Sequence, residues 1–179
     1  MTDQMTVLFV KHTGHVLAVV TRNADPKGKI SAENLARGGL LVRGFTANAA
    51  TNTTGNEQFK VLPEELDVMT VDLDSALLLQ PRAFIIDDGQ PVQTPNVTVP
   101  NVSLSLTNVT VTLGAAVTEE TKVWVQVDGG NLAEPRIAEG KIPNGATSTV
   151  LQIQTLDPGI YYVLTLVVDR LPDARSQTV

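Results

Sequence analysis

The segment from Asn96 to Leu113, NVTVPNVSLSLTNVTVTL, constrains the fold of this chain more than any other. It alternates Val or Leu with Thr, Ser or Asn, which is the period-two pattern of a half-buried β-strand. The phase of the alternation changes at Pro100-Asn101 and again at Thr107-Asn108. Because a strand cannot bury both phases on one side, each change predicts a turn, a bulge or a crossing between sheets. The segment therefore predicts consecutive strands of a layered β-structure.

Strand-like runs continue through the second half of the chain. We expect further strands at 122–127, 136–142, 149–155 and 160–169, with turn residues between them. Short strands at this spacing predict a β-sandwich over residues 96–172, followed by a tail over 173–179. The segment that precedes the sandwich, DDGQPVQTP, holds a Gly and two Pro and predicts a linker over 89–95.

The first half has the pattern of a smaller β-rich unit over residues 1–88. Two β-branched runs at 7–11 and 16–21 predict a hairpin around His12-Thr13-Gly14-His15. Ser31 can cap a short helix over 31–37, and Thr46–Asn56 has the composition of an exposed loop. The expected fold class is thus mainly β: a small β-rich N-terminal unit with one short helix, followed by the sandwich. Further strands of this unit are expected at 40–45, 59–62 and 66–73.

The last predicted hairpin carries a known signature. Residues Leu156 to Leu166, LDPGIYYVLTL, fit the pattern L-x-P-G-x-x-Y-x-L-x-L. This segment resembles the tyrosine corner of fibronectin type III and related immunoglobulin-like β-sandwiches. The resemblance implies an immunoglobulin-like sandwich in which Leu156 fills one end of the core. It also implies that Pro158 and Gly159 form the turn and that the Tyr162 hydroxyl bonds back to it. It implies no particular activity, and we recognise no family for the N-terminal half.

The composition argues against several classes of function. The chain has no Cys, which rules out disulfides, thiolate zinc sites and a Cys nucleophile. A formal net charge of −6 argues against non-specific binding to nucleic acid, since nothing would neutralise a run of phosphates. No apolar run approaches the about 18 residues of a membrane-spanning helix, and the N-terminus lacks the pattern of a signal peptide. We therefore expect a protein that is made in the cytoplasm without a signal peptide and does not insert into a membrane.

Two groups of polar residues are candidates for chemistry. His12 and His15 are the only two histidines and could face one metal ion, but the local sequence supplies no third ligand. Asp72 and Asp74 share one face of a predicted strand, where carboxylates more often serve solubility than acid–base catalysis. We therefore expect no catalytic residues, no metal and no cofactor. The alternative is an enzyme that combines the histidine hairpin with a carboxylate such as Asp72.

The aromatic residues of the second half are the candidate contacts with a ligand or partner. Trp124 alternates with Val123 and Val125, so its side chain faces outward if the valines face the core. Burial of both faces of this strand is the alternative. We expect Trp124 and Tyr161 to make the contacts.

The expected function is that of a non-enzymatic structural or interaction subunit. Strands poor in charge leave edges that are weakly defended against pairing with another chain. Low charge, many Val, Thr and Asn residues and no Cys are similar to the composition of bacterial or phage-like sheath, tail, capsid and fibre subunits. The partners would be other protein subunits in a homo- or hetero-oligomer, within a virion or another large particle. The alternative is a carbohydrate- or receptor-binding module that uses the exposed face of the C-terminal sandwich, with a saccharide as ligand.

Overall fold

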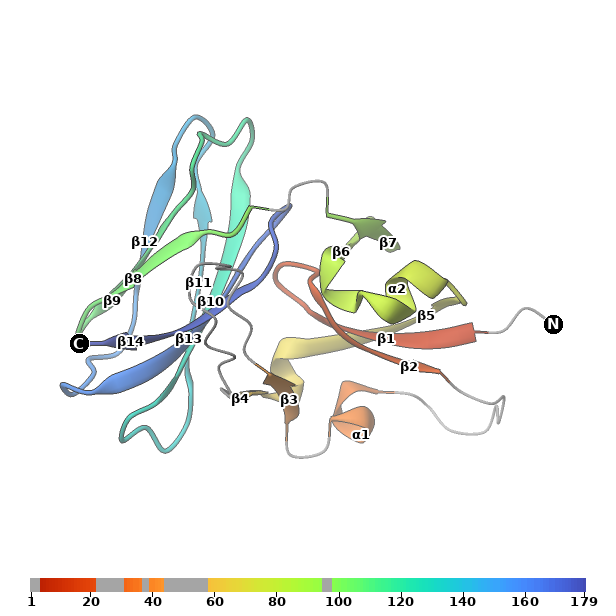
Figure 1. Cartoon of the computed structure of the whole chain (residues 1–179), viewed down its shortest axis with the longest axis horizontal. Helices are drawn as coiled ribbons and strands as arrows, with labels where there is room; N and C mark the ends of the chain where they lie inside the picture. Colours follow the sequence, from red (N-terminus) through yellow and green to blue (C-terminus); the bar gives the residue numbers. More distant parts are fainter. Residues whose placement is uncertain (1–3, 22–30, 37–38, 44–57, 95–97) are drawn as a thin grey trace.

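The computed structural model describes residues 4–21, 31–36, 39–43, 58–94 and 98–179. Over these residues the chain is mainly β: strands β1 to β14 form antiparallel sheets, accompanied by two short α-helices and two 3₁₀ turns. Figure 1 shows the N-terminal half at one end of the molecule and the sandwich at the other. The loop expected at Thr46–Asn56 lies outside the described residues.

The N-terminal half is built around a three-stranded sheet of order β2-β1-β5. The turn between β1 (Gln4–Val10) and β2 (Val16–Thr21) packs Gly14 against Ile86, where a Cβ would collide with the Ile86 carbonyl oxygen. Two further hairpins, β3 with β4 and β6 with β7, adjoin this sheet. The remaining elements are α1 (Ala32–Leu35), β3 (Leu40–Arg43), β4 (Gln58–Val61), η1 (Pro63–Glu65), β5 (Leu66–Asp72), α2 (Ser75–Leu79), η2 (Pro81–Ala83), β6 (Phe84–Asp87) and β7 (Gln90–Gln93).

Each α-helix begins after a residue that caps it. The Ser31 side chain accepts a hydrogen bond from the Asn34 N–H at 3.2 Å, so the helix expected here is confirmed. Asp74 caps α2 in the same way and accepts from the amides of Ala76 and Leu77. The expectation of one helix is therefore wrong, because α2 is a second one. A carboxylate directly before an apolar run is the sequence signal that predicts it.

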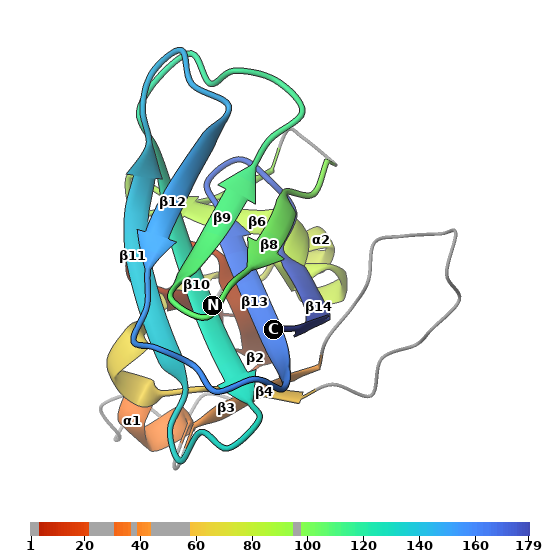
Figure 2. The same ribbon diagram turned by 90° about the vertical axis from the view of Figure 1, so that its left-hand side faces the viewer.

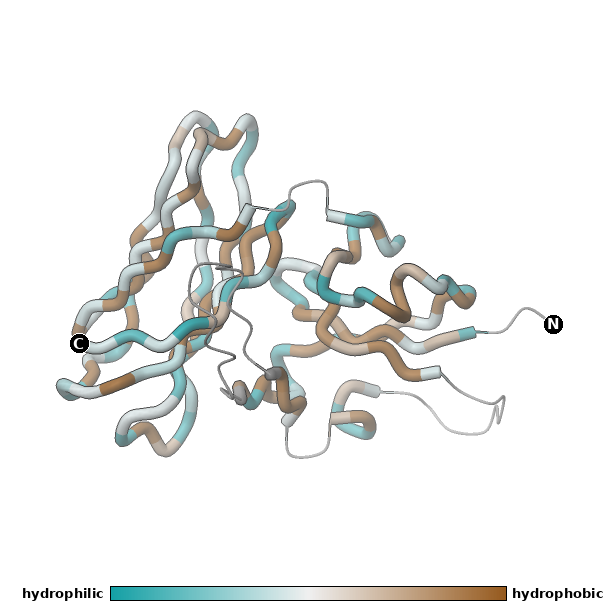
Figure 3. The backbone as a smooth tube through the Cα atoms, in the orientation of Figure 1, coloured by the Kyte–Doolittle hydropathy of each residue, from teal (hydrophilic) through white to brown (hydrophobic). Residues whose placement is uncertain are grey.

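The C-terminal half is a β-sandwich of two antiparallel sheets (Figure 2), of order β12-β9-β8 and β11-β10-β13-β14. Hydrophobic and hydrophilic residues alternate along its strands (Figure 3). The two predicted phase changes coincide with the start of β8 and with the turn between β8 and β9. Residues 173–179 are not a tail, because most of them form β14, which pairs with β13. The strands are β8 (Asn101–Leu104), β9 (Asn108–Thr112), β10 (Thr121–Gly129), β11 (Arg136–Ile142), β12 (Ser148–Gln152), β13 (Ile160–Val167) and β14 (Asp173–Thr178).

The sheet β11-β10-β13-β14 is buried on both faces. Val123, Val125 and Val127 of β10 lie in the core between the two sandwich sheets. Trp124 of the same strand lies in a second core, together with Phe59 and other residues of the N-terminal half. Of the two arrangements left open by the sequence pattern, the strand buried on both sides is the one that forms.

The two halves therefore pack against each other through a shared core. The Gln126 side chain adds a hydrogen bond across this contact, from its Nε2 to the Lys60 carbonyl oxygen at 3.0 Å. Residues 90–93 of the expected linker form β7, which pairs with β6. The N-terminal half thus adds a third layer over the central sheet (Figure 1).

Candidate interaction edge of the sandwich

Trp124 does not reach the surface. Its side chain has no exposed area, and the indole Nε1–H donates a hydrogen bond to a Glu65 carboxylate oxygen at 3.0 Å. The expected contact between Trp124 and a ligand is therefore corrected to a contact between the two halves of the chain.

The hydroxyl bond to the preceding turn that was expected of Tyr162 is made by Tyr161. Tyr161 is buried in the sandwich core with Leu156, and its hydroxyl donates to the Asp157 carbonyl oxygen at 2.8 Å. Tyr162 faces the N-terminal half and meets the Phe59 ring edge to face, with 6.5 Å between ring centroids. The expected roles are thus exchanged, because neighbouring residues of β13 point into the two different cores. The segment before β13 holds the exposed Pro158 and the half-buried Gly159.

The two histidines contact the sandwich at two different places. His12 Nδ1 lies 3.2 Å from a Glu139 carboxylate oxygen on β11. His15 is fully buried, and its Nε2 lies 3.0 Å from the carbonyl oxygen of Arg170, which can accept the Nε2–H of a neutral ring. Burial lowers the pKa of His15 from 6.5 to about 4, so the ring is neutral near pH 7. Among the described residues, no group of three or more His, Cys, Asp or Glu side chains could hold a metal ion.

Asp72 and Asp74, the candidates for acid–base chemistry, both have defined positions in the N-terminal half. Asp72 ends β5, and Asp74 directs one carboxylate oxygen to the first amides of α2. Both line a polar hollow of about 710 Å³ beside the turn between β6 and β7. The carboxylate of Asp74 is therefore engaged by the helix start and does not extend the face of β5.

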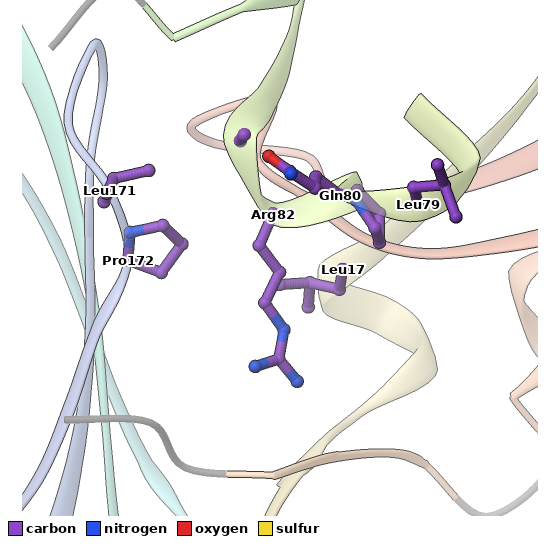
Figure 4. Close-up of a pocket in the computed structure, with 8 residues that line it drawn as sticks. Leu17, Leu79, Gln80, Arg82, Leu171 and Pro172 are labelled. Carbon is purple, nitrogen blue, oxygen red and sulfur yellow. The ribbon is translucent and has the colours of Figure 1, made fainter. Parts of the chain in front are cut away.

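A mainly apolar cavity of about 530 Å³ lies where the two halves meet (Figure 4). Leu79 lines this cavity and is 79% exposed. Arg82 extends along the cavity, and burial lowers the pKa of its guanidinium. The lining residues are Leu17, Leu79, Gln80, Pro81, Arg82, Ala83, Leu171 and Pro172.

One edge of the smaller sandwich sheet is covered by side chains of β14. The Ser105 amide donates to the Asn108 carbonyl oxygen, so the alternation of an antiparallel pair leaves Val102 and Leu104 with backbone groups directed away from β9. The Gln177 side chain bonds one group of each residue: its Nε2 donates to the Val102 carbonyl at 2.6 Å, and its Oε1 accepts from the Leu104 amide at 2.8 Å. We call β8 the covered edge, because the amide of Gln177 takes the place of a neighbouring strand.

Arg175 extends the cover of β8 by one more residue. Its guanidinium donates to the Pro100 carbonyl oxygen at 3.2 Å and to both carboxylate oxygens of the buried Asp173. A bidentate pair of this kind fixes the guanidinium in one orientation. The covered edge is thus held by a rigid polar network on β14.

The opposite edge of the same sheet is open. The Leu113 amide donates to the Thr147 carbonyl, and the Ile153 amide donates to the Thr107 carbonyl, at 2.8 and 2.9 Å. Thr147, Ile153 and the odd-numbered residues between them therefore bond to β9. Within the described part of the chain, no strand pairs with β12 on its other side. The residues whose amide and carbonyl groups point outward there are Ser148, Val150 and Gln152.

The open edge also lacks the charges that usually prevent strand pairing. No charged residue occurs from Ile142 to Leu156, and Val150 is 54% exposed. Natural proteins protect such edges with Lys, Pro, bulges or short strands. The neighbouring edge strand β11 does carry charges, with Glu139 and Lys141 both exposed. The uncharged run is visible in the sequence, but which strand forms an edge is not, so sequence analysis missed this site.

Comparisons with known proteins return nothing similar: no family model, no curated protein and no solved structure matches the chain. In the segments that the structure describes, no helix is long and apolar enough to cross a membrane.

Proposed function

We propose that this protein is a non-enzymatic structural or interaction subunit of a larger protein assembly, joined to its neighbours by strand addition at β12. The observation that carries the proposal is the contrast between the two edges of one sheet. The chain covers β8 with specific side-chain hydrogen bonds and leaves β12 open, uncharged and partly apolar. An added strand gains main-chain hydrogen bonds from such an edge, and the exposed side chains set its specificity.

The proposal includes a fibronectin type III or immunoglobulin-like class for the sandwich. The order of the strands supports it: the first, second and fifth strands form one sheet, and the other four form the second. The hydroxyl bond of Tyr161 to a residue four positions upstream is the geometry of a tyrosine corner. Composition supports a particle such as a phage-like or bacterial sheath, tail, capsid or fibre.

Carbohydrate or receptor binding is not the function that the geometry favours. That alternative depends on aromatic rings that can stack on a sugar. Trp124 and Tyr161 are 0% and 1% exposed, so neither ring is accessible to a ligand.

The native size of the protein tests the proposal. In lysate of the cells that make it, we expect the chain to sediment far above its 19.1 kDa. Val150→Lys places a charge on the open edge and should shift sedimentation towards a single chain. Leu41→Lys is the matched control, because Leu41 is equally apolar and exposed but lies on β3 in the N-terminal half. A wild-type protein that sediments as a monomer would contradict the proposal.

A further inference from the structure

The open edge is self-complementary, and this suggests what occupies it. We propose that β12 pairs in antiparallel fashion with β12 of a second copy of this chain, about a two-fold axis at Val150. This inference rests on the proposed function and names the partner at that same edge.

The backbone pattern of β12 fits a two-fold axis at its centre. The outward groups belong to Ser148, Val150 and Gln152, which are symmetric about Val150. A second copy related by the axis sets Val150 opposite itself and Ser148 opposite Gln152 of the second copy. All three pairs are then of the hydrogen-bonded type, which gives about six new main-chain hydrogen bonds. The two smaller sheets become one continuous sheet.

The side chains of β12 are compatible with this register. Val150 would pair with its own equivalent on the outer face, and cross-strand pairs of β-branched residues are favourable. A charged residue at the centre of a two-fold axis would face the same charge of the second copy. No charged residue occurs from Ile142 to Leu156, so this repulsion is absent. Leu151 stays in the sandwich core and does not enter the contact.

Charges on β11 favour a copy of this chain over an unrelated partner. Gly140 lies directly beneath Leu151, where a Cβ would collide with the leucine Cδ2, so the axis through Val150 passes close to Gly140. Glu139 and Lys141 flank Gly140 with opposite charges and are exposed. Within the single chain Glu139 contacts His12 and Lys141 contacts Glu120, so a second copy would add a partner to each existing pair. The same rotation turns Glu139 towards Lys141 of the second copy and Lys141 towards its Glu139. This pairing of opposite charges follows from the two-fold symmetry and needs no other protein.

The experiment uses the absence of Cys from the chain, because any introduced thiol is the only one. Val150→Cys is incubated with oxidised glutathione and examined by non-reducing electrophoresis. In the proposed register the two Cα atoms are about 5.5 Å apart, within the range that a disulfide spans. We expect a disulfide-linked dimer at twice 19.1 kDa. Because Val150 is exposed, the substitution leaves the core unchanged.

Ser148→Cys and Gln152→Cys are the matched controls for register. In either variant alone, the introduced Cys and the same Cys of the second copy lie about 13 Å apart across the axis, which is beyond the reach of a disulfide. An equimolar mixture of the two places them opposite each other, so we expect the mixture to crosslink and each single variant not to. Crosslinking of Ser148→Cys alone to the extent of Val150→Cys would overturn the register.

The outcomes separate this inference from the proposed function. If the wild type is large in native lysate but Val150→Cys does not crosslink in that lysate, the assembly stands and self-pairing is refuted. If the wild type is a monomer and Val150→Cys does not crosslink, both are refuted. Crosslinking of Val150→Cys and of the mixture only, together with a large native size, supports both.

Discussion

Replacing Trp124 by Ala should destabilise the whole protein, because this side chain joins the two halves. The indole is fully buried in the core shared with the N-terminal half and donates a hydrogen bond to Glu65. Truncation of a buried Trp to Ala typically costs about 3–5 kcal/mol, since transfer free energy is lost and a cavity remains. Small proteins are stable by about 5–15 kcal/mol in total, so Trp124→Ala should be marginally folded.

Urea denaturation followed by far-UV circular dichroism measures this loss. Trp124→Phe is the matched variant: it keeps an aromatic ring but removes the N–H donor and some volume, and should lose less stability than Trp124→Ala. The wild type offers a second readout, because Trp124 is the only Trp in the chain. Its fluorescence reports the contact between the halves, and its transition should coincide with that of the circular dichroism.

Two results would refute this reasoning. A loss below about 1 kcal/mol for Trp124→Ala would be ordinary for a surface position and would mean that the side chain is not in a core. A fluorescence transition that clearly precedes the circular dichroism transition would mean that the halves separate before they unfold.

Four further substitutions test other contacts. Because burial lowers the pKa of His15 from 6.5 to about 4, the unfolded chain takes up a proton at higher pH than the folded one. The stability present above pH 6.5 should therefore fall by up to about 3 kcal/mol as the pH approaches 4. Urea midpoints for wild type and His15→Gln should show this slope in the wild type alone. Tyr161→Phe should lose about 1 kcal/mol because its hydroxyl bond to Asp157 is removed, whereas Tyr162→Phe should lose less. Equal losses in thermal unfolding would contradict this difference between the two tyrosines. Gln177→Ala should uncover β8 and increase self-association in light scattering, and an unchanged scattering intensity would show that this edge needs no cover.

The strands of the sandwich could be predicted because their burial is local in sequence. The alternation of Val and Leu with polar residues gave the strands from Asn101 onward, and the phase changes located the turns. The same method could not place Trp124. In β10 every residue from Val123 to Val127 is buried, and a period-two pattern contains no information on which layer covers which face.

The last strand, β14, could not be predicted because its sequence lacks a hydrophobic alternation. Residues 173–178, DARSQT, are mostly polar and lack the alternation of Val or Leu. Their polar side chains are nevertheless used inside the structure, where Arg175 and Gln177 bond to the backbone of β8. The candidate edge at β12 escaped sequence analysis because the order of strands within a sheet is set by tertiary structure.

The core shared by the two halves has a consequence for how the chain folds during its synthesis. The N-terminal half contributes Leu8, Phe59 and Leu66 to a core that Trp124, Leu164 and Leu166 complete. A ribosome adds about 5–20 residues per second, so several seconds pass between the emergence of β4 and that of β13. During this interval the apolar surface of the N-terminal half has no partner within its own chain and is exposed to aggregation or to chaperones. Folding of the first half is therefore completed by the last strands to be made.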